Sequence, residues 1–172
     1  TGMGRLGILA NHGTTSPTAI DPDVRRLDEV EAIARLDGLE VEGLFTHFAA
    51  ADSADKAHAE LQLERFRRLT DALHSRGIDI PIKHLANSAA LIDMPDSHLD
   101  MVRPGIATYG LYPSEGVDRE RVKLKPVLEW KARVIQVKEV PAGFGVSYGI
   151  TYETPQPTTL ATVAVGYADG LS

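Results

Sequence analysis

The first part of the chain carries two stripes of hydrophobic residues at the spacing of an α-helix. One runs through Asp23–Asp37 and the other through Ala54–Arg76. The apolar members are Val24, Leu27, Val30, Ile33 and Ala34 in the first segment, and Leu61, Phe66, Leu69 and Leu73 in the second. Residues that recur every three to four positions fall on one helix face. Gly38 and Gly77 directly follow the two segments, and glycine commonly ends helices. The pattern therefore predicts two helices, each with one buried face.

Short apolar runs bounded by polar residues alternate with these stripes. They cover Val41–His47, Ile82–Ala86, Met101–Val102 and Ala107–Leu111. Runs of this kind are consistent with buried strands. A short helix is expected from Ser88 to Ile92, with Asn87 as its N-cap, because an asparagine side chain can accept a hydrogen bond from the first turn. Strands that alternate with helices predict a parallel sheet with crossover helices, an α/β fold.

The pattern changes in the second part of the chain, after a polar linker at 113–126. Val127–Val140 alternates apolar with polar residues, Leu160–Val165 forms another strand-like run, and no helical period appears. Alternation with a period of two is typical of a half-buried strand. We therefore expect an α/β domain at 1–112 and the start of a mainly β domain at 127–172.

Composition narrows the possible classes of protein. Of the 172 residues, 43% are hydrophobic and 24% are charged, as in ordinary globular chains. The net charge of −6 argues against a general attraction to nucleic acid or to acidic membranes. The absence of cysteine excludes disulfides and thiolate metal sites, and we expect no metal. No apolar run approaches the roughly 18 residues of a membrane helix and no signal-peptide pattern is present, so we expect a cytoplasmic protein.

Polar residues gather where the predicted strands end. They are Arg5, His47, His84, Asn87, Ser88 and Arg103, with Gly105 in the turn that follows Arg103. In parallel α/β folds, ligands bind at the carboxyl ends of the strands. A single histidine at a strand end is more often structural than functional. Four strand ends with such residues nevertheless favour a shared site.

Two local features fit a phosphate-binding site, although each has a structural alternative. Ser88 opens a short helix, where its hydroxyl and nearby N–H groups could bind an anion. Gly105 and Ile106 lie in a turn where the backbone could approach a ligand closely. A helix cap and a tight turn would use the same residues. Tyr148 and Tyr167 lie near glycines, which fits either an exposed acid/base hydroxyl or a core tyrosine beside a bend.

Six motifs, in their order along the chain, resemble those of the bacterial alanine racemase family. They are TGMGRLG at 1–7, LFTHFAAAD at 44–52, HLANSAA at 84–90, DMVRPGIATYGLYP at 100–113, VSYGITY at 146–152 and VGYADG at 165–170. The resemblance covers nearly the whole chain. It implies an enzyme that uses pyridoxal 5′-phosphate (PLP), with a (β/α)8 TIM barrel followed by a mainly β domain. The α/β domain would be the second half of that barrel.

The resemblance also implies roles for the candidate residues. Tyr148 matches the catalytic tyrosine that takes or gives the α-proton on one face of the substrate. Arg103 matches the arginine bonded to the pyridine nitrogen, and His47 and His84 match histidines connected to it. The resemblance places the PLP phosphate at Ser88, Gly105 and Ile106, and gives Asn87 a further contact with the cofactor. It implies that Arg5 and Tyr167 contact the substrate. The family also implies alanine as substrate, D-alanine supply for peptidoglycan, and a homodimer with shared active sites.

One essential family motif is missing. The lysine that holds PLP and acts as the second base lies in a motif that this chain does not contain, and Lys56, Lys83, Lys123 and Lys125 all lie outside it. A complete barrel needs about 250 residues. We therefore expect a central fragment of a longer protein, here called the parent, and expect the fragment alone to be inactive. Two alternatives stay open: a racemase for serine, lysine or another amino acid, and a non-catalytic PLP-binding half-barrel.

Overall fold

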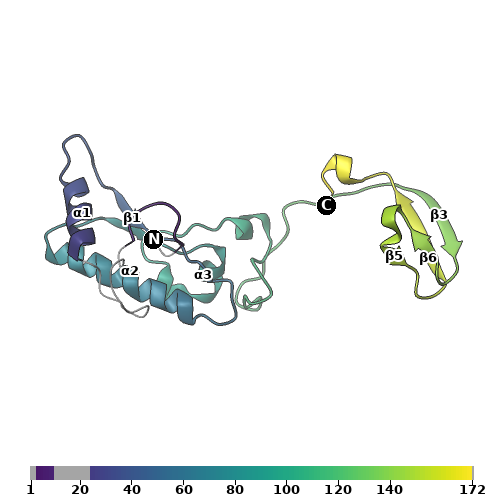
Figure 1. Cartoon of the computed structure of the whole chain (residues 1–172), viewed down its shortest axis with the longest axis horizontal. Helices are drawn as coiled ribbons and strands as arrows, with labels where there is room; N and C mark the ends of the chain where they lie inside the picture. The colour runs from purple at the N-terminus through teal and green to yellow at the C-terminus, as the bar shows by residue number, and fades with distance from the viewer. Residues whose placement is uncertain (1–2, 10–23, 172) are drawn as a thin grey trace. The chain divides into compact units, whose positions relative to one another are not determined.

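The computed structural model describes residues 3–9 and 24–171, and the chain divides into two compact units, 1–127 and 128–172 (Figure 1). The helices and strands described in the first unit are α1 (Val24–Ala34), β1 (Gly43–Phe45), α2 (Ala57–Ser75), β2 (Ile82–His84) and α3 (Ser88–Asp93), followed by the short 3-10 helices η1 (Pro95–Ser97) and η2 (Ile106–Tyr109). β1 and β2 pair in parallel, with Leu44 opposite Lys83. Because α2 connects them, the unit contains the predicted strand–helix–strand crossover.

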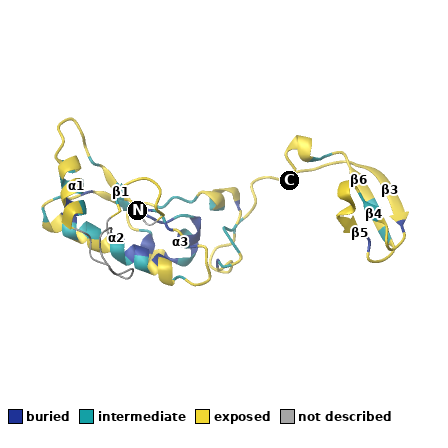
Figure 2. Ribbon diagram, viewed as in Figure 1, coloured by how far each residue is buried: buried dark blue, intermediate teal, exposed yellow. Residues whose placement is uncertain are grey.

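The main hydrophobic core of the first unit lies beside the carboxyl ends of β1 and β2. Phe48, Phe66 and Leu85 are buried in it. A second cluster joins α1 to α2 through Leu27 and Leu73. Figure 2 shows buried residues concentrated on α2 and α3. Since Phe48 and Leu85 come just after the two strands, the core fixes the direction in which the chain leaves each strand.

The predicted cap and stop signals of two helices are confirmed. The side chain of Asn87 accepts a hydrogen bond from Ala90 N at 3.1 Å, so it caps α3. At the end of α2, Gly77 adopts a φ of 76°, and Ile78 N donates to Leu73 O at 3.0 Å. A left-handed residue followed by this backward bond is a common helix ending, and glycine adopts that φ without steric cost.

The predicted helical faces needed correction. Val24 and Ile33 of α1 are exposed, whereas Leu27 is the buried residue of this helix. On α2 the residues Gln62 and Leu63 are buried, although the sequence pattern placed neither on the inner face. The shift reflects packing against the segment after β1, which a helical period cannot anticipate.

The strands are shorter than the apolar runs that predicted them. The runs at 41–47 and 82–86 give strands of only three residues each. Leu44 packs against the core, whereas Phe45 on the opposite face is 56% exposed. The strand expected to be buried at 41–47 is therefore exposed on one face in the described part of the chain.

The strands expected at 101–102 and 107–111 are not formed. Residues 101–102 have no regular structure, and η2 replaces most of the second run. Gly110 ends η2 with a φ of 78°, and a Cβ there would collide with the carbonyl of Lys125. Val127 N donates to Tyr109 O at 3.3 Å, so this hydrogen bond holds the two ends of the segment 110–126 next to each other. A short apolar run does not distinguish a strand from a short helix, which explains the error.

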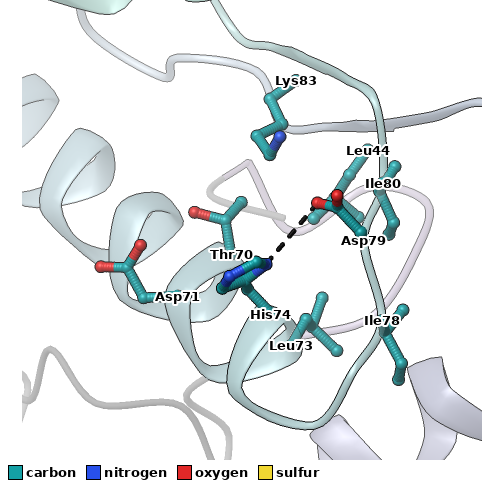
Figure 3. A pocket seen from close by; sticks show the side chains of 9 residues that line it. All are labelled: Leu44, Thr70, Asp71, Leu73, His74, Ile78, Asp79, Ile80 and Lys83. Atoms are coloured by element: carbon teal, nitrogen blue, oxygen red, sulfur yellow. Dashed lines mark ion pairs between the residues drawn. The ribbon is translucent and has the colours of Figure 1, made fainter.

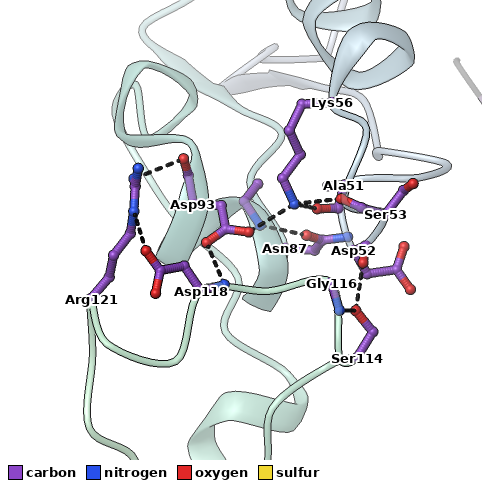
Figure 4. Close-up of polar contacts among 11 residues, drawn as sticks. Ala51, Asp52, Ser53, Lys56, Asn87, Asp93, Ser114, Gly116, Asp118 and Arg121 are labelled. Carbon is purple, nitrogen blue, oxygen red and sulfur yellow. Dashed lines mark hydrogen bonds and ion pairs between the residues drawn. The ribbon is translucent and has the colours of Figure 1, made fainter.

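The segment after Pro113 packs against the first unit. Val117 is buried in its core, and the Tyr112 hydroxyl accepts from Leu124 N at 3.2 Å. Polar contacts attach it further (Figure 4): Asp118 N donates to the Asp93 carboxylate at 3.1 Å, and the same carboxylate pairs with Lys56 at 2.7 Å. This polar stretch is therefore an ordered part of the unit.

The second unit is mainly β, as expected. β3 (Val134–Val140) pairs antiparallel with β6 (Thr158–Val163), and the short strands β4 (Gly145–Val146) and β5 (Tyr152–Glu153) form a separate hairpin. Two single-turn 3-10 helices complete it, η3 (Tyr148–Ile150) and η4 (Tyr167–Asp169). The alternating run at 127–140 becomes a strand only from Val134 onward.

Candidate functional site

The side chain of Arg103 is held by three groups at the carboxyl ends of β1 and β2. Its Nη1 donates to Nδ1 of His84, while its Nη2 donates to the carbonyl of Thr46 at 3.0 Å and to Nδ1 of His47 at 3.1 Å. The backbone of Arg103 is also fixed, because its N–H donates to Ala86 O at 3.0 Å. A guanidinium presents its donors in a rigid plane, so three such bonds determine its orientation.

Aromatic contacts complete this arrangement. The rings of Phe45 and His84 stack with their centroids 5.2 Å apart and an angle of 9° between the planes. The guanidinium carbon of Arg103 lies 5.4 Å from the Phe45 ring centroid. A cation over an aromatic face is attracted by its quadrupole. We call Arg103, His47, His84, Thr46 and Phe45 the arginine clamp.

Both histidines of the clamp are held in the neutral form. Burial lowers the pKa of His84, and the charge of Arg103 lowers it further. Burial likewise lowers the pKa of His47, with additional effects from Arg103 and Arg5. Because arginine can only donate, each Nδ1 must accept, which leaves the ring hydrogen on Nε2. Burial also lowers the pKa of Arg103.

A second group of predicted residues meets where two short helices begin. Ser88 is the first residue of α3 and is buried, and its Oγ accepts a hydrogen bond from Ala107 N of η2 at 3.1 Å. Gly105 immediately precedes η2, and the position that a Cβ would occupy there is open. Ile106 is partly exposed beside it. Helix starts favour anions, and the Ser88 hydroxyl beside the open space at Gly105 suits a phosphate.

The remaining predicted residues lie elsewhere in the described chain. Arg5 lies in an exposed turn of the first unit and acts electrostatically on His47. Tyr148 and Tyr167 belong to the second unit, where they are 98% and 91% exposed. The structure thus joins Arg103 with both histidines, and Ser88 with the start of η2. Each tyrosine is placed within its own unit only.

Three residues of the site were not predicted from the sequence. Thr46 contributes a backbone carbonyl, which carries no side-chain signal. Phe45 was counted as part of a buried strand, although its spacing of two from His47 places both on one strand face. Gln62 is buried on α2, and its side-chain amide donates to the backbone carbonyl of His47. A polar residue within an otherwise apolar helix face was the available signal for Gln62.

The residues that line a pocket in the first unit are not those of the candidate site. Figure 3 shows this pocket between the end of α2 and the loop that precedes β2, where His74 lies 3.7 Å from Asp79.

Across residues 3–9 and 24–171, no group of three or more histidine, aspartate or glutamate side chains could hold a metal ion. In the same described ranges, no helix combines the length and the hydropathy needed to cross a membrane.

Comparison with known families matches both parts of the chain. The family model for the alanine racemase N-terminal domain matches residues 1–113, and that for the alanine racemase C-terminal domain matches residues 127–172. Curated relatives include alanine racemases from Desulfosudis oleivorans, at 59% identity, and Methanococcus maripaludis, at 45%. Each match covers 100% of this chain and 43% of the relative. The chain therefore spans less than half the length of these relatives.

Solved structures agree with the sequence matches. Alanine racemase from Clostridium difficile superposes with a TM-score of 0.75 at 38% identity, over 99% of this chain and 42% of that one. The enzyme from Bacillus anthracis with bound L-Ala-P gives a TM-score of 0.69 at 35% identity, over 98% of this chain and 41% of that one. The chain corresponds to the end of the TIM barrel and the start of the β domain. It belongs to the alanine racemase family.

Proposed function

We propose that the parent protein is a PLP-dependent alanine racemase that interconverts L-alanine and D-alanine. The observation that carries this proposal is the arginine clamp, in which Arg103 is oriented by His47, His84 and Thr46. Family membership supports the reaction, and the clamp supports the specific way in which it would be performed.

The described residues fit PLP at two places. Ser88 offers a hydroxyl and Ile106 a backbone N–H for the phosphate, the space beside Gly105 lets it approach, and Asn87 holds the start of α3. Arg103 offers a guanidinium for the pyridine nitrogen. Bound PLP supplies an electron sink that makes the α-proton of an attached amino acid acidic.

Arg103 sets the strength of that sink. An arginine donates hydrogen bonds but retains its own protons, because its pKa is far above neutrality. Arg103 would donate a hydrogen bond to the pyridine nitrogen of bound PLP and would leave that nitrogen unprotonated. Compared with a carboxylic acid at this position, Arg103 would therefore give weaker stabilisation of negative charge at the α-carbon. This suits racemisation, in which the proton must return quickly and competing reactions must be avoided.

Two bases on opposite faces of the α-carbon complete the chemistry. We assign Tyr148 to one face of the α-carbon. There its oxygen takes the α-proton of one enantiomer, and in the reverse reaction it gives a proton to the α-carbon on the same face. The opposite base would be the lysine that also holds PLP, which lies outside this chain. The free pKa of tyrosine is about 10, so a cationic environment must lower it for work at neutral pH. Arg5 would bind the substrate carboxylate, and Tyr167 would lie at the substrate entrance.

The proposal includes a homodimer. Tyr148 belongs to the second unit, while the clamp belongs to the first, and family resemblance supports an active site completed by Tyr148 of the partner subunit. We place the parent in the cytoplasm, where it would supply D-alanine for peptidoglycan. The fragment of residues 1–172 lacks the second base and should be inactive alone.

The test uses the full-length parent with PLP. We expect racemisation of L-alanine, and slower turnover of L-serine and L-lysine. Arg103→Lys should lower kcat strongly, since a lysine cannot make the same planar set of bonds. A parent that binds PLP but racemises none of the three amino acids would contradict the proposal. If L-serine or L-lysine were turned over faster than L-alanine, the parent would instead be a racemase for that amino acid.

A further inference from the structure

Thr154 anchors the hairpin that carries Tyr148. Its side chain is almost completely buried, at 1% exposure. Its hydroxyl donates to Pro141 O at 2.7 Å and accepts from Phe144 N at 3.0 Å. The Thr154 hydroxyl therefore both donates and accepts a hydrogen bond, and both bonds go to the turn at 141–144.

The backbone of Thr154 fastens the same turn. Gly143 N donates to Thr154 O at 2.7 Å, and Thr154 N donates to Phe144 O at 3.1 Å. Together with the two hydroxyl bonds, these contacts fix the turn immediately before β4. β4 then leads directly to Ser147 and Tyr148, so a displacement at Thr154 would be transmitted along two paired strands.

The loop between β4 and β5 requires such an anchor. Ser147 has φ 60° and ψ −169°, a region occupied almost only by glycine. Ile150 has φ 50°, which is unusual for a β-branched residue. Such conformations persist only where the surrounding structure determines them. Tyr148 lies between these two residues and is itself 98% exposed, so within this unit its position depends on the loop backbone.

Gly145 supports the loop from the other strand. A Cβ at Gly145 would collide with Cγ2 of Ile150, so the side chain of Ile150 occupies the space that glycine leaves. Thr154, which follows β5, and Gly145 of β4, which leaves room for Ile150, thus support the loop from its two sides.

We propose that Thr154 is a positioning residue for Tyr148, fixing the depth at which the tyrosine oxygen reaches the α-carbon. This inference rests on the proposed racemase function. Thr154 touches neither substrate nor cofactor and acts through the turn at 141–144. Its effect should therefore fall on the proton transfer that Tyr148 performs and not on the transfer at the opposite face.

The experiment compares Thr154→Val, which removes the hydroxyl at nearly constant shape, with Thr154→Ser, which retains it. Thr158→Val is the control, because it removes another hydroxyl bond, from Thr158 to Gln156 O, in the same unit. In the full-length parent we expect Thr154→Val to lower kcat by about 10- to 100-fold, as small misplacements of catalytic groups do. Thr154→Ser and Thr158→Val should stay near the wild type.

Isotope effects separate positioning from general damage. With α-deuterated substrates, the primary isotope effect of Thr154→Val should rise for the enantiomer that Tyr148 deprotonates and fall for the other enantiomer. A loss of correctly folded enzyme would lower activity and leave both isotope effects unchanged, which would overturn the proposal. If Thr154→Val does not fold, Gly145→Ala displaces Ile150 instead and should give the same opposed changes.

Hydrogen exchange provides a readout that is independent of activity. In the cofactor-free parent, amides of 143–150 should exchange faster in Thr154→Val than in Thr154→Ser. Equal exchange in the two variants would contradict the anchoring role. A wild-type parent without racemase activity would refute the proposed function, while the exchange experiment would still decide whether Thr154 holds the loop.

Discussion

Gln62 on α2 holds the backbone of His47 by donating from its side-chain amide to the His47 carbonyl at 3.2 Å. The same side chain accepts from Ala49 N at 2.9 Å. Gln62 is buried, and both bonds are partly buried. One helix residue thus satisfies two backbone groups on either side of Phe48. The carboxyl end of β1, and with it one side of the arginine clamp, is thereby attached to α2.

Replacing Gln62 with leucine should destabilise the parent. The change removes two partly buried hydrogen bonds, to the His47 carbonyl and from the Ala49 N–H, and each such bond contributes about 0.5–1.5 kcal/mol. We expect the free energy of unfolding in urea to fall by about 1–3 kcal/mol. Gln136→Leu, on exposed β3, is the control and should change it by less than about 0.5 kcal/mol. Equal effects of the two substitutions would show that Gln62 has no special role.

The neutral histidines of the clamp predict a dependence of stability on pH. Their pKa values are lowered in the folded state, so between that pKa and about 6.5 the unfolded chain binds more protons. Stability contributed by His47 and His84 is therefore present above about pH 6.5 and is lost as the pH falls below it.

Urea unfolding of the cofactor-free parent between about pH 5 and 7.5 measures this effect. The wild type should lose stability toward low pH, and the double variant His47→Gln/His84→Gln should lose less. His58→Gln, at an exposed position on α2, should retain the wild-type slope. A double variant with the same slope as the wild type would contradict the prediction.

The ion pair of Lys56 and Asp93 predicts a large stability effect for a single lysine. The two side chains are only 19% and 6% exposed, and Lys56 also donates to the carbonyls of Ala51 at 2.8 Å and Ser53 at 2.7 Å. Lys56→Met would leave a buried carboxylate without its partner, at a cost of about 3–5 kcal/mol in unfolding free energy. Lys123→Met breaks an exposed pair with Glu120 and should cost about 0–1 kcal/mol. Similar losses for the two variants would refute this difference.

The proposed homodimer with shared active sites predicts complementation between inactive variants of the parent. Tyr148→Phe removes one base, and a second variant lacks the PLP-binding lysine. In a mixed dimer, one site inherits both lesions and the other inherits neither. About half of the dimers are mixed and each has one good site, so exchange should recover about a quarter of wild-type activity. Subunit exchange without recovery would mean that Tyr148 acts within its own chain.

Local signals predicted some elements well because their physics is local. The cap of α3 by Asn87 and the stop of α2 at Gly77 each depend on residues within one turn. The alternation of helices and strands, and the change to β structure, likewise followed from periodicity. The exact strands did not: η2 forms where an apolar run suggested a strand, because Gly110 and the approach of Lys125 decide the local conformation.

The candidate site divides in the same way. Arg103, His47 and His84 were predicted as residues at strand ends, and the structure brings them into contact. Thr46 and Gln62 contribute through backbone bonds made between distant segments, which depend on the packing of α2. Thr154 stands 10 residues from the nearest bonded amide, Phe144, so no local pattern could reveal it.

The hydrogen bond between Tyr109 and Val127 has a consequence for how this region tolerates insertions. It joins the two ends of the segment 110–126, and Arg119 and Glu120 near the middle of that segment are exposed. Doubling the length of a flexible loop with fixed ends costs only about 0.6 kcal/mol of closure entropy. Extra residues placed between Arg119 and Glu120 would lengthen this segment while its two ends stay joined. Sequences of different length can therefore occupy this position, and it offers a place for a peptide tag or a fluorescent reporter.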